Sequence, residues 1–245
     1  SIPLLGKFEP QGVANMVWSF EKVKASNPRL FDEVSNAVVA LDNLGKFDPQ
    51  ALSNILLAFA KAEESNPRLF KKVADHIVEH GNLGEFKPQE LSNTVWAFVK
   101  AEESDTRLFK MMADHIIALD NLHSFKPQDL SNIVWAFATA GESNPELFKK
   151  VADHIIALGN LREFDPQALS NTAWAYATAE ESHSTLFKTM AKHILALDNL
   201  HSFKPQGLSN TVWAFAKAEE SHPRLFKKVA DHIVEHDNLG EFHCT

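Results

Sequence analysis

The chain has 245 residues, 44% of them hydrophobic, and a formal net charge of −8. A chain of this size and composition can bury a large core without disulfide staples, and its one cysteine, Cys244, excludes an internal disulfide. No apolar run approaches the roughly 18 residues of a membrane-spanning helix, so we expect no membrane span. The acidic balance counts against nucleic-acid binding unless basic side chains gather on one face.

A sequence repeat with a period of 39 residues runs along the chain. Its clearest marks are seven phenylalanines: Phe8, Phe47, Phe86, Phe125, Phe164, Phe203 and Phe242. A fixed period of roughly 20–50 residues is typical of a repeat architecture, in which each unit buries its apolar face against its neighbours. We predict six repeats, at 8–46, 47–85, 86–124, 125–163, 164–202 and 203–241. Residues 1–7 then read as the end of a preceding repeat and 242–245 as the start of a truncated seventh, so we expect a longer array.

Each repeat predicts two helices. In the repeat at 47–85, Pro49 suits the first position of a helix, and Asp48 can cap it. This helix A is expected to run to about Glu63. Asn66-Pro67 indicates a second start, and helix B is expected to end at His80, before Gly81-Asn82. Paired helices joined by short loops predict an all-α fold, an α-solenoid of six helix-turn-helix repeats.

Helical periodicity divides each helix into two arcs. Helix A is expected to bury Leu52, Leu56, Phe59 and Ala60, and the tryptophan column lies on the same arc. The opposite arc is small and polar, and we expect it to face solvent or a ligand; it holds Ala51, Asn54, Ile55, Ala58, Lys61 and Ala62. Helix B is expected to bury Leu69, Phe70, Val73, Ala74 and Ile77.

Two columns on the small, polar arc are candidate ligand contacts. One is unbroken and consists of Asn15, Asn54, Asn93, Asn132, Asn171 and Asn210. An amide can pair with base edges or with a peptide backbone, although it can equally hold neighbouring repeats in register. The other column contains Lys22, Lys61, Lys100 and Lys217, with Thr139 and Thr178 between them. These lysines could follow phosphates or simply be solvated.

The position after the Pro-Gln pair varies and reads Gly12, Ala51, Glu90, Asp129, Ala168 and Gly207. Variation on a constant scaffold is what recognition of one nucleotide per repeat requires, so Ala51, Glu90, Asp129 and Ala168 are candidate specificity residues. Drift at a tolerant surface position would look the same. The tryptophan column, in which Leu57 stands once, is expected to pack between repeats; base stacking is the alternative.

Metal and catalytic chemistry are not expected. The pattern His76-x-x-Glu79-His80 matches a zinc-binding spacing, and His232, Glu235 and His236 repeat it. However, His80 and His236 only replace a leucine of the other repeats, and no third ligand stands out. We therefore expect no metal site, no cofactor and no enzymatic activity.

The string F-x-P-Q-x-L-S-N-T-V-W-A-F-A at 203–216 resembles the octotricopeptide repeat (OPR), a two-helix unit of organellar proteins in algae; related arrays precede RAP domains. The resemblance covers all six repeats. It implies an α-solenoid that binds single-stranded RNA in a chloroplast or mitochondrion and acts in transcript maturation, stability or translation. The 39-residue period departs from the family's 38.

Two functions remain open at this stage. The first is an RNA-binding solenoid whose A helices line the ligand face. The second is a protein–protein interaction scaffold that binds an extended peptide or belongs to a larger assembly, and the acidic balance favours it. End-to-end association through uncapped terminal repeats is a third expectation.

Overall fold

The computed structural model describes residues 8–25, 27–80 and 82–235. Over these residues the secondary structure is helical, with no strand, and no helix is both long enough and apolar enough to cross a bilayer. The expectations for residues 1–7 and 242–245, and for Cys244 and His236, lie outside the described residues. The chain divides into two compact units between Ala118 and Leu119.

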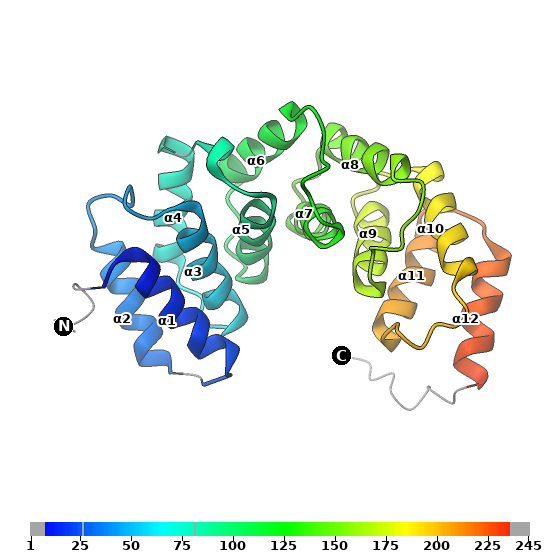
Figure 1. The fold of residues 1–245 in the computed structure, drawn as a ribbon, viewed down its shortest axis with the longest axis horizontal. Helices are drawn as coiled ribbons and strands as arrows, with labels where there is room; N and C mark the ends of the chain where they lie inside the picture. The colour runs from blue at the N-terminus through cyan, green and yellow to red at the C-terminus, as the bar shows by residue number, and fades with distance from the viewer. Residues whose placement is uncertain (1–7, 26, 81, 236–245) are drawn as a thin grey trace. The chain divides into compact units, whose positions relative to one another are not determined.

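The first unit contains three pairs of helices and one short 3₁₀ helix (Figure 1). Its helices are α1 (Pro10–Lys22), α2 (Pro28–Val39), α3 (Pro49–Lys61), α4 (Pro67–His80), η2 (Leu83–Glu85), α5 (Pro88–Lys100) and α6 (Thr106–Ala118). The second unit contains α7 (Pro127–Ala140), α8 (Pro145–Ala157), α9 (Pro166–Thr178), α10 (Ser184–Ala196), α11 (Pro205–Lys217) and α12 (Pro223–Glu235). The odd-numbered helices are the predicted A helices and the even-numbered ones the B helices.

Local sequence sets the helix ends. Proline occupies the first turn of every A helix, where its missing N–H is not needed. Every A helix is followed, one or two residues after its end, by a residue with positive φ: Lys24, Glu63, Glu102, Gly141, Glu180 and Glu219. A left-handed residue closes a helix and reverses the chain within a short loop. The reversal brings helix B back beside helix A.

Within each unit the helices pack consecutively, as in a solenoid. Helix α3 packs against α1 and α5, and helix α9 packs against α7 and α11. Within the two units, an edge-to-face ring contact joins four B helices to the following A helix: Phe31–Phe59, Phe70–Phe98, Phe148–Tyr176 and Phe187–Phe215, with centroids 4.9 to 5.1 Å apart. The Tyr176 hydroxyl also donates to the Phe148 carbonyl oxygen at 2.7 Å. The all-α solenoid prediction is confirmed.

The predicted apolar arcs are also confirmed. Leu52, Leu56, Phe59 and Ala60 of α3 are buried, and so are the predicted core residues of α4. The expectation for the opposite arc of helix A is wrong at three positions, because Ala51, Ile55 and Ala58 are at most 1% exposed. The physical reason is that an A helix inside a stack is covered by an A helix on each side as well as by B helices. Small side chains there allow close approach of the neighbouring helix rather than contact with a ligand.

Candidate functional site

One narrow strip of each A helix remains open to solvent within its unit. In α5 it consists of Gln89, Asn93, Trp96 and Lys100, at spacings of four, three and four residues, which lie along one line of an α-helix. Gln89 and Lys100 are exposed, whereas Asn93 and Trp96 are half-buried. We call this line and its equivalents in the other A helices the A-helix strip. Its glutamines are Gln11, Gln50, Gln89, Gln128, Gln167 and Gln206.

The asparagines of the A-helix strip lie at its centre. Asn15 is exposed and accepts a hydrogen bond from Gln11 Nε2 at 3.1 Å. The other five are half-buried, and their side-chain amides make no hydrogen bond within the described residues; they are Asn54, Asn93, Asn132, Asn171 and Asn210. The alternative role for this column was to hold neighbouring repeats in register. No hydrogen bond from these five amides to a neighbouring repeat is present in the described residues. Each of these amides keeps two donors and one acceptor for another partner.

The tryptophans lie on the same strip, beside the asparagines. Trp18 is 43% exposed and Trp213 is 45% exposed, while Trp96, Trp135 and Trp174 are half-buried. The Trp135 and Trp174 rings lie 6.5 Å apart, centroid to centroid, and are tilted by 35°. The predicted packing between repeats is confirmed for Trp135 and Trp174, which lie on neighbouring A helices. Each tryptophan of the column stays at least partly exposed, because the position lies at the edge of the buried arc.

The lysines lie at the C-terminal end of the strip, as expected. Two of them contact other side chains of the protein. Lys22, Lys61, Lys100 and Lys217 are all exposed. Lys61 Nζ lies 6.0 Å from the centroid of the Trp96 ring, a cation–π distance. Lys217 Nζ contacts Glu180 Oε1 at 3.1 Å, and Glu180 is one of the left-handed residues that follow the A helices. An acidic rim therefore borders the lysine end of the strip and offsets part of its positive charge.

The variable position after Pro-Gln is not on the strip. Ala51 and Ala168 are 1% and 3% exposed, and Glu90 and Asp129 are 8% and 6% exposed. All four are buried in the first turn of an A helix, so the expectation that they face a ligand from an open surface is wrong. The sequence pattern misleads here because the neighbouring A helix covers this turn.

Helix capping explains the variation at this position. Where the preceding cap residue is aspartate, its carboxylate accepts from the backbone N–H of an alanine: Asp48 from Ala51 and Asp165 from Ala168, both at 2.7 Å. Where the cap residue is lysine, the acid comes from the variable position. Glu90 accepts from the Lys87 N–H at 2.8 Å, and Asp129 accepts from the Lys126 N–H at 3.0 Å. In these four helices the two positions therefore vary together and supply one carboxylate per helix start. In α1 and α11, where the variable position is glycine, no side chain caps the helix.

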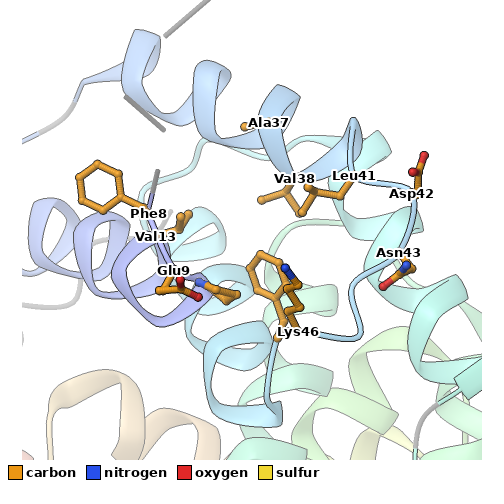
Figure 2. A pocket seen from close by; sticks show the side chains of 11 residues that line it. Phe8, Glu9, Val13, Ala37, Val38, Leu41, Asp42, Asn43 and Lys46 are labelled. Carbon is orange, nitrogen blue, oxygen red and sulfur yellow. The ribbon is translucent and has the colours of Figure 1, made fainter. Parts of the chain in front are cut away.

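A cavity of about 420 Å³ lies in the first unit, away from the strip. Figure 2 shows Val38 and Leu41 on one side of it and Glu9 with Val13 on another. Its remaining polar lining comes from Asp42, Asn43 and Lys46, and no strip residue lines it. A second cavity, of about 370 Å³, does lie on the strip, in the second unit, where it is lined by residues of α7, α9 and α11.

The histidines of the B helices do not assemble a metal site. His76 and His80 stack with ring centroids 5.6 Å apart, and the described residues contain no group of three or more His, Cys, Asp or Glu side chains that could hold a metal ion. Burial lowers the pKa of His76, His115, His154 and His193 below the ordinary value for histidine. All four are half-buried, and the His154 ring contacts the His123 ring of the preceding repeat with centroids 5.4 Å apart.

The glutamine and tryptophan columns are the strip residues that sequence reasoning did not select. Gln50 is four residues before Asn54, and Leu57, at the tryptophan position, is three residues after it. These spacings place all three positions along one line, and that signal was present in the sequence. It was hidden because the tryptophan column also adjoins the apolar arc.

The chain matches the model of a known protein family. A family model described as the RNA-editing substrate-binding complex 6 protein (RESC6) matches residues 5–127, 40–154 and 117–239. No curated protein matches the chain. The three overlapping matches span nearly all of the sequence, and the described part of every repeat lies within them. This chain, with its stacked helix pairs and its open strip of amides and indoles, therefore belongs by sequence match to the RNA-editing substrate-binding complex 6 protein family.

Proposed function

We propose that this protein binds single-stranded RNA along its A-helix strip, as a non-catalytic component of an RNA-editing substrate-binding complex. The observation that carries the proposal is the strip itself. It places an amide in all six A helices, an indole in five and a lysine in four at the same register, and most of its asparagine amides have no partner within the described residues. The family description, which names a complex that binds RNA-editing substrates, supports the same ligand.

Each part of the strip suits a different part of an RNA strand. The asparagine and glutamine amides can donate to and accept from base edges or the ribose 2′-hydroxyl. The open indole faces can stack on bases, a contact that contributes about 1–3 kcal/mol per base. The lysines can pair with phosphates. If one repeat meets one base, the six repeats contact about six nucleotides.

The buried first-turn residues then contribute to recognition only indirectly, by fixing where each A helix begins. Differences within the strip are the better candidates for discrimination between bases. Leu57 stands where the other A helices have tryptophan, and Thr139 and Thr178 stand where the others have lysine.

Location follows from the same proposal. RNA-editing complexes are typically mitochondrial, so of the two organelles that the sequence resemblance implied, we propose the mitochondrion. The relation to the octotricopeptide repeat in particular, and a role in transcript maturation, stability or translation, remain predictions. Import of the full-length protein with a fluorescent tag, imaged against mitochondrial and plastid markers, would test the location.

A salt-dependent binding assay tests the proposal. The chain is titrated into a fluorescein-labelled pool of random single-stranded RNA, and anisotropy is followed at 50 and 200 mM salt. We expect binding at the lower salt and a clear loss of affinity at the higher, because phosphate contacts release counterions. Absence of binding at 50 mM would contradict the proposal.

Two double lysine variants locate the binding face. Lys61→Ala with Lys100→Ala removes two positive charges from the A-helix strip. Lys110→Ala with Lys149→Ala removes the same two charges from the B helices, where each lysine forms an exposed ion pair within its own helix. Because the net charge is identical, non-specific attraction is equal in the two proteins. We expect weaker binding and a smaller salt dependence only for the first pair; equal losses would remove the strip from the proposal.

A protein scaffold is the second candidate function, and the acidic rim favours it. The left-handed residues Glu63, Glu102, Glu180 and Glu219 follow the A helices, and each is solvent-exposed. Together with the net charge of −8, they would attract a basic extended peptide whose backbone pairs with the asparagines. Affinity capture from mitochondria with and without ribonuclease separates the two functions. Partners that survive ribonuclease and depend on the asparagine column would favour the scaffold.

End-to-end association is a separate prediction. Phe226 and Val234 of α12 are 36% and 77% exposed, whereas Phe187, which is equivalent to Phe226 one repeat earlier, is fully buried. Sedimentation velocity over a wide range of protein concentration tests it. A single monomeric species at every concentration would exclude it.

A further inference from the structure

The strip cavity of the second unit is lined by residues of three A helices, α7, α9 and α11. Trp135 is the lining residue from α7. Helix α9 and the residue before it contribute Asp165, Pro166, Gln167, Ser170 and Asn171, and helix α11 with its approach contributes Ser202, Lys204, Gln206, Gly207 and Asn210. At about 370 Å³ the cavity falls within the usual size range of small-ligand sites, about 300–1,000 Å³.

A glycine, Gly207, is one of the lining residues of this cavity. Gly207 occupies the first-turn position that holds Ala168 in α9 and Asp129 in α7. A Cβ atom placed on Gly207 would lie 3.0 Å from Ser170 Oγ, so any larger residue must displace that hydroxyl. Glycine also provides no carboxylate, and no side chain caps the start of α11. The first turn of α11 therefore has no side chain at this position and carries less negative charge than the first turns of α5 and α7.

The lining groups fit one nucleotide. Trp135 is half-buried and leaves part of its indole open at the cavity. The amides of Asn171 and Asn210 face the same space from adjacent helices and can pair with the donors and acceptors of a base edge. Lys204, just before α11, supplies a positive charge at the helix end where backbone N–H groups favour an anion. The Asp165 carboxylate already accepts from the Ala168 N–H, and it keeps a phosphate away from the α9 side.

We propose that this cavity holds a single unstacked nucleotide of the bound RNA and is the strongest base-recognition site of the second unit. The base stacks on Trp135, Asn171 and Asn210 pair with its edge, and the adjoining phosphate lies beside Lys204. This inference rests on the proposed function, and it adds a location and a chemistry.

The decisive comparison uses one substitution at two equivalent positions. Gly207→Ala adds a methyl group against Ser170, another lining residue of the cavity, whereas Gly12→Ala makes the same change at the equivalent position of α1, outside it. The probe is a random single-stranded RNA pool carrying 4-thiouridine and fluorescein. We expect Gly207→Ala to weaken binding about fivefold or more, which is the loss of one stacked base, and Gly12→Ala to leave it unchanged. Thermal unfolding of each variant verifies that the fold is intact.

Photo-cross-linking with the same pool gives a second readout. Irradiation followed by peptide mapping should place a strong adduct in residues 165–171 or 202–210 of the wild-type chain, and Gly207→Ala should remove it. A further variant, Trp135→Leu, copies the leucine found at position 57 and so preserves a residue type that the stack accepts. It should lose affinity to a similar degree.

The outcomes separate this inference from the proposed function. RNA binding with an adduct in these peptides that Gly207→Ala abolishes supports the inference. RNA binding without such an adduct, or with equal affinities for the two alanine variants, overturns it and leaves RNA binding along the strip in place. No RNA binding at low salt overturns the proposed function and this inference with it.

Discussion

The first turn of helix A changes its residue from repeat to repeat, whereas the centre of its open strip keeps the same asparagine. The first-turn position holds glycine, alanine, glutamate or aspartate; where it is alanine or an acid, it is buried and serves the helix start. The asparagine position is identical in all six repeats, yet five of its amides have no hydrogen-bond partner within the described residues. Variation in a repeat can thus have a purely local cause. A residue that is the same in every repeat, without an internal contact that requires it, is the better evidence for an external partner.

The largest effect should come from placing a charge at a small position that the sequence suggested was open. Ala58 is fully buried between A helices. We expect Ala58→Glu to lower the free energy of unfolding by at least about 3 kcal/mol, because the side chain is both too large and charged. Urea unfolding followed by circular dichroism measures the change.

Gln50→Glu serves as the matched control, since it adds the same charge to the exposed strip of the same helix. Its effect should stay within about 0.5 kcal/mol, because the glutamate lies in the first turn, where the helix dipole favours it. Equal stability of the Ala58 variant and its control would mean that the small arc is open after all.

The shared cap predicts a compensating pair. Glu90→Ala removes the carboxylate that accepts from the Lys87 N–H and should cost about 0.5–2 kcal/mol. Adding Lys87→Asp rebuilds the arrangement of Asp48 and Ala51 and should restore most of that loss. A double-mutant cycle from urea unfolding tests the coupling, and strictly additive effects would contradict the capping explanation.

The fold was predictable because the 39-residue period, the prolines and the apolar arcs all describe local structure. The helix bounds at Pro49, Pro67 and His80 followed from turn and cap residues, and the buried leucines from periodicity. The site was predictable only in part. The asparagine and lysine columns lie on the open strip, but the burial of Ala51 and Glu90 depends on how closely the next A helix approaches, and helical periodicity does not contain that distance. The open edge of the tryptophans depends on the same packing.

We expect low pH to lower the stability of the fold because histidines of the B helices, and not residues of the strip, take up protons. Burial lowers the pKa of His115 and His193 in the folded state, with Arg162 adding to the effect at His193. Burial acts likewise on His76, reinforced by His80 and Lys72 against Glu79, and on His154, reinforced by His123. The unfolded chain therefore binds protons more readily near pH 6.5. Stability is complete above that pH and is lost as pH falls toward the lower folded-state values.

Urea midpoints at pH 7.5 and 5.5 measure this loss. His115→Ala, which copies the alanine at position 37 of the first repeat, should show a smaller decrease between the two pH values. An unchanged pH dependence in that variant would mean that other groups cause the loss.

The smallest expected change in stability has the opposite sign. Asn132→Ala removes a residue with weak helix propensity and no side-chain hydrogen bond within the described residues. Alanine is the better helix former, so stability should rise by up to about 0.6 kcal/mol. RNA affinity should fall in the same variant. A loss of stability would indicate an internal role for the asparagine column.

A cross-linking map of the whole chain tests the central claim most directly. The 4-thiouridine RNA pool is irradiated with the wild-type protein at low salt, and every adduct is assigned to a residue. We predict adducts along the A-helix strip of both units, at or beside its asparagines and tryptophans, and few on the B helices. Adducts concentrated on the B helices, or spread evenly over the surface, would contradict the claim that the strip is where this protein binds RNA.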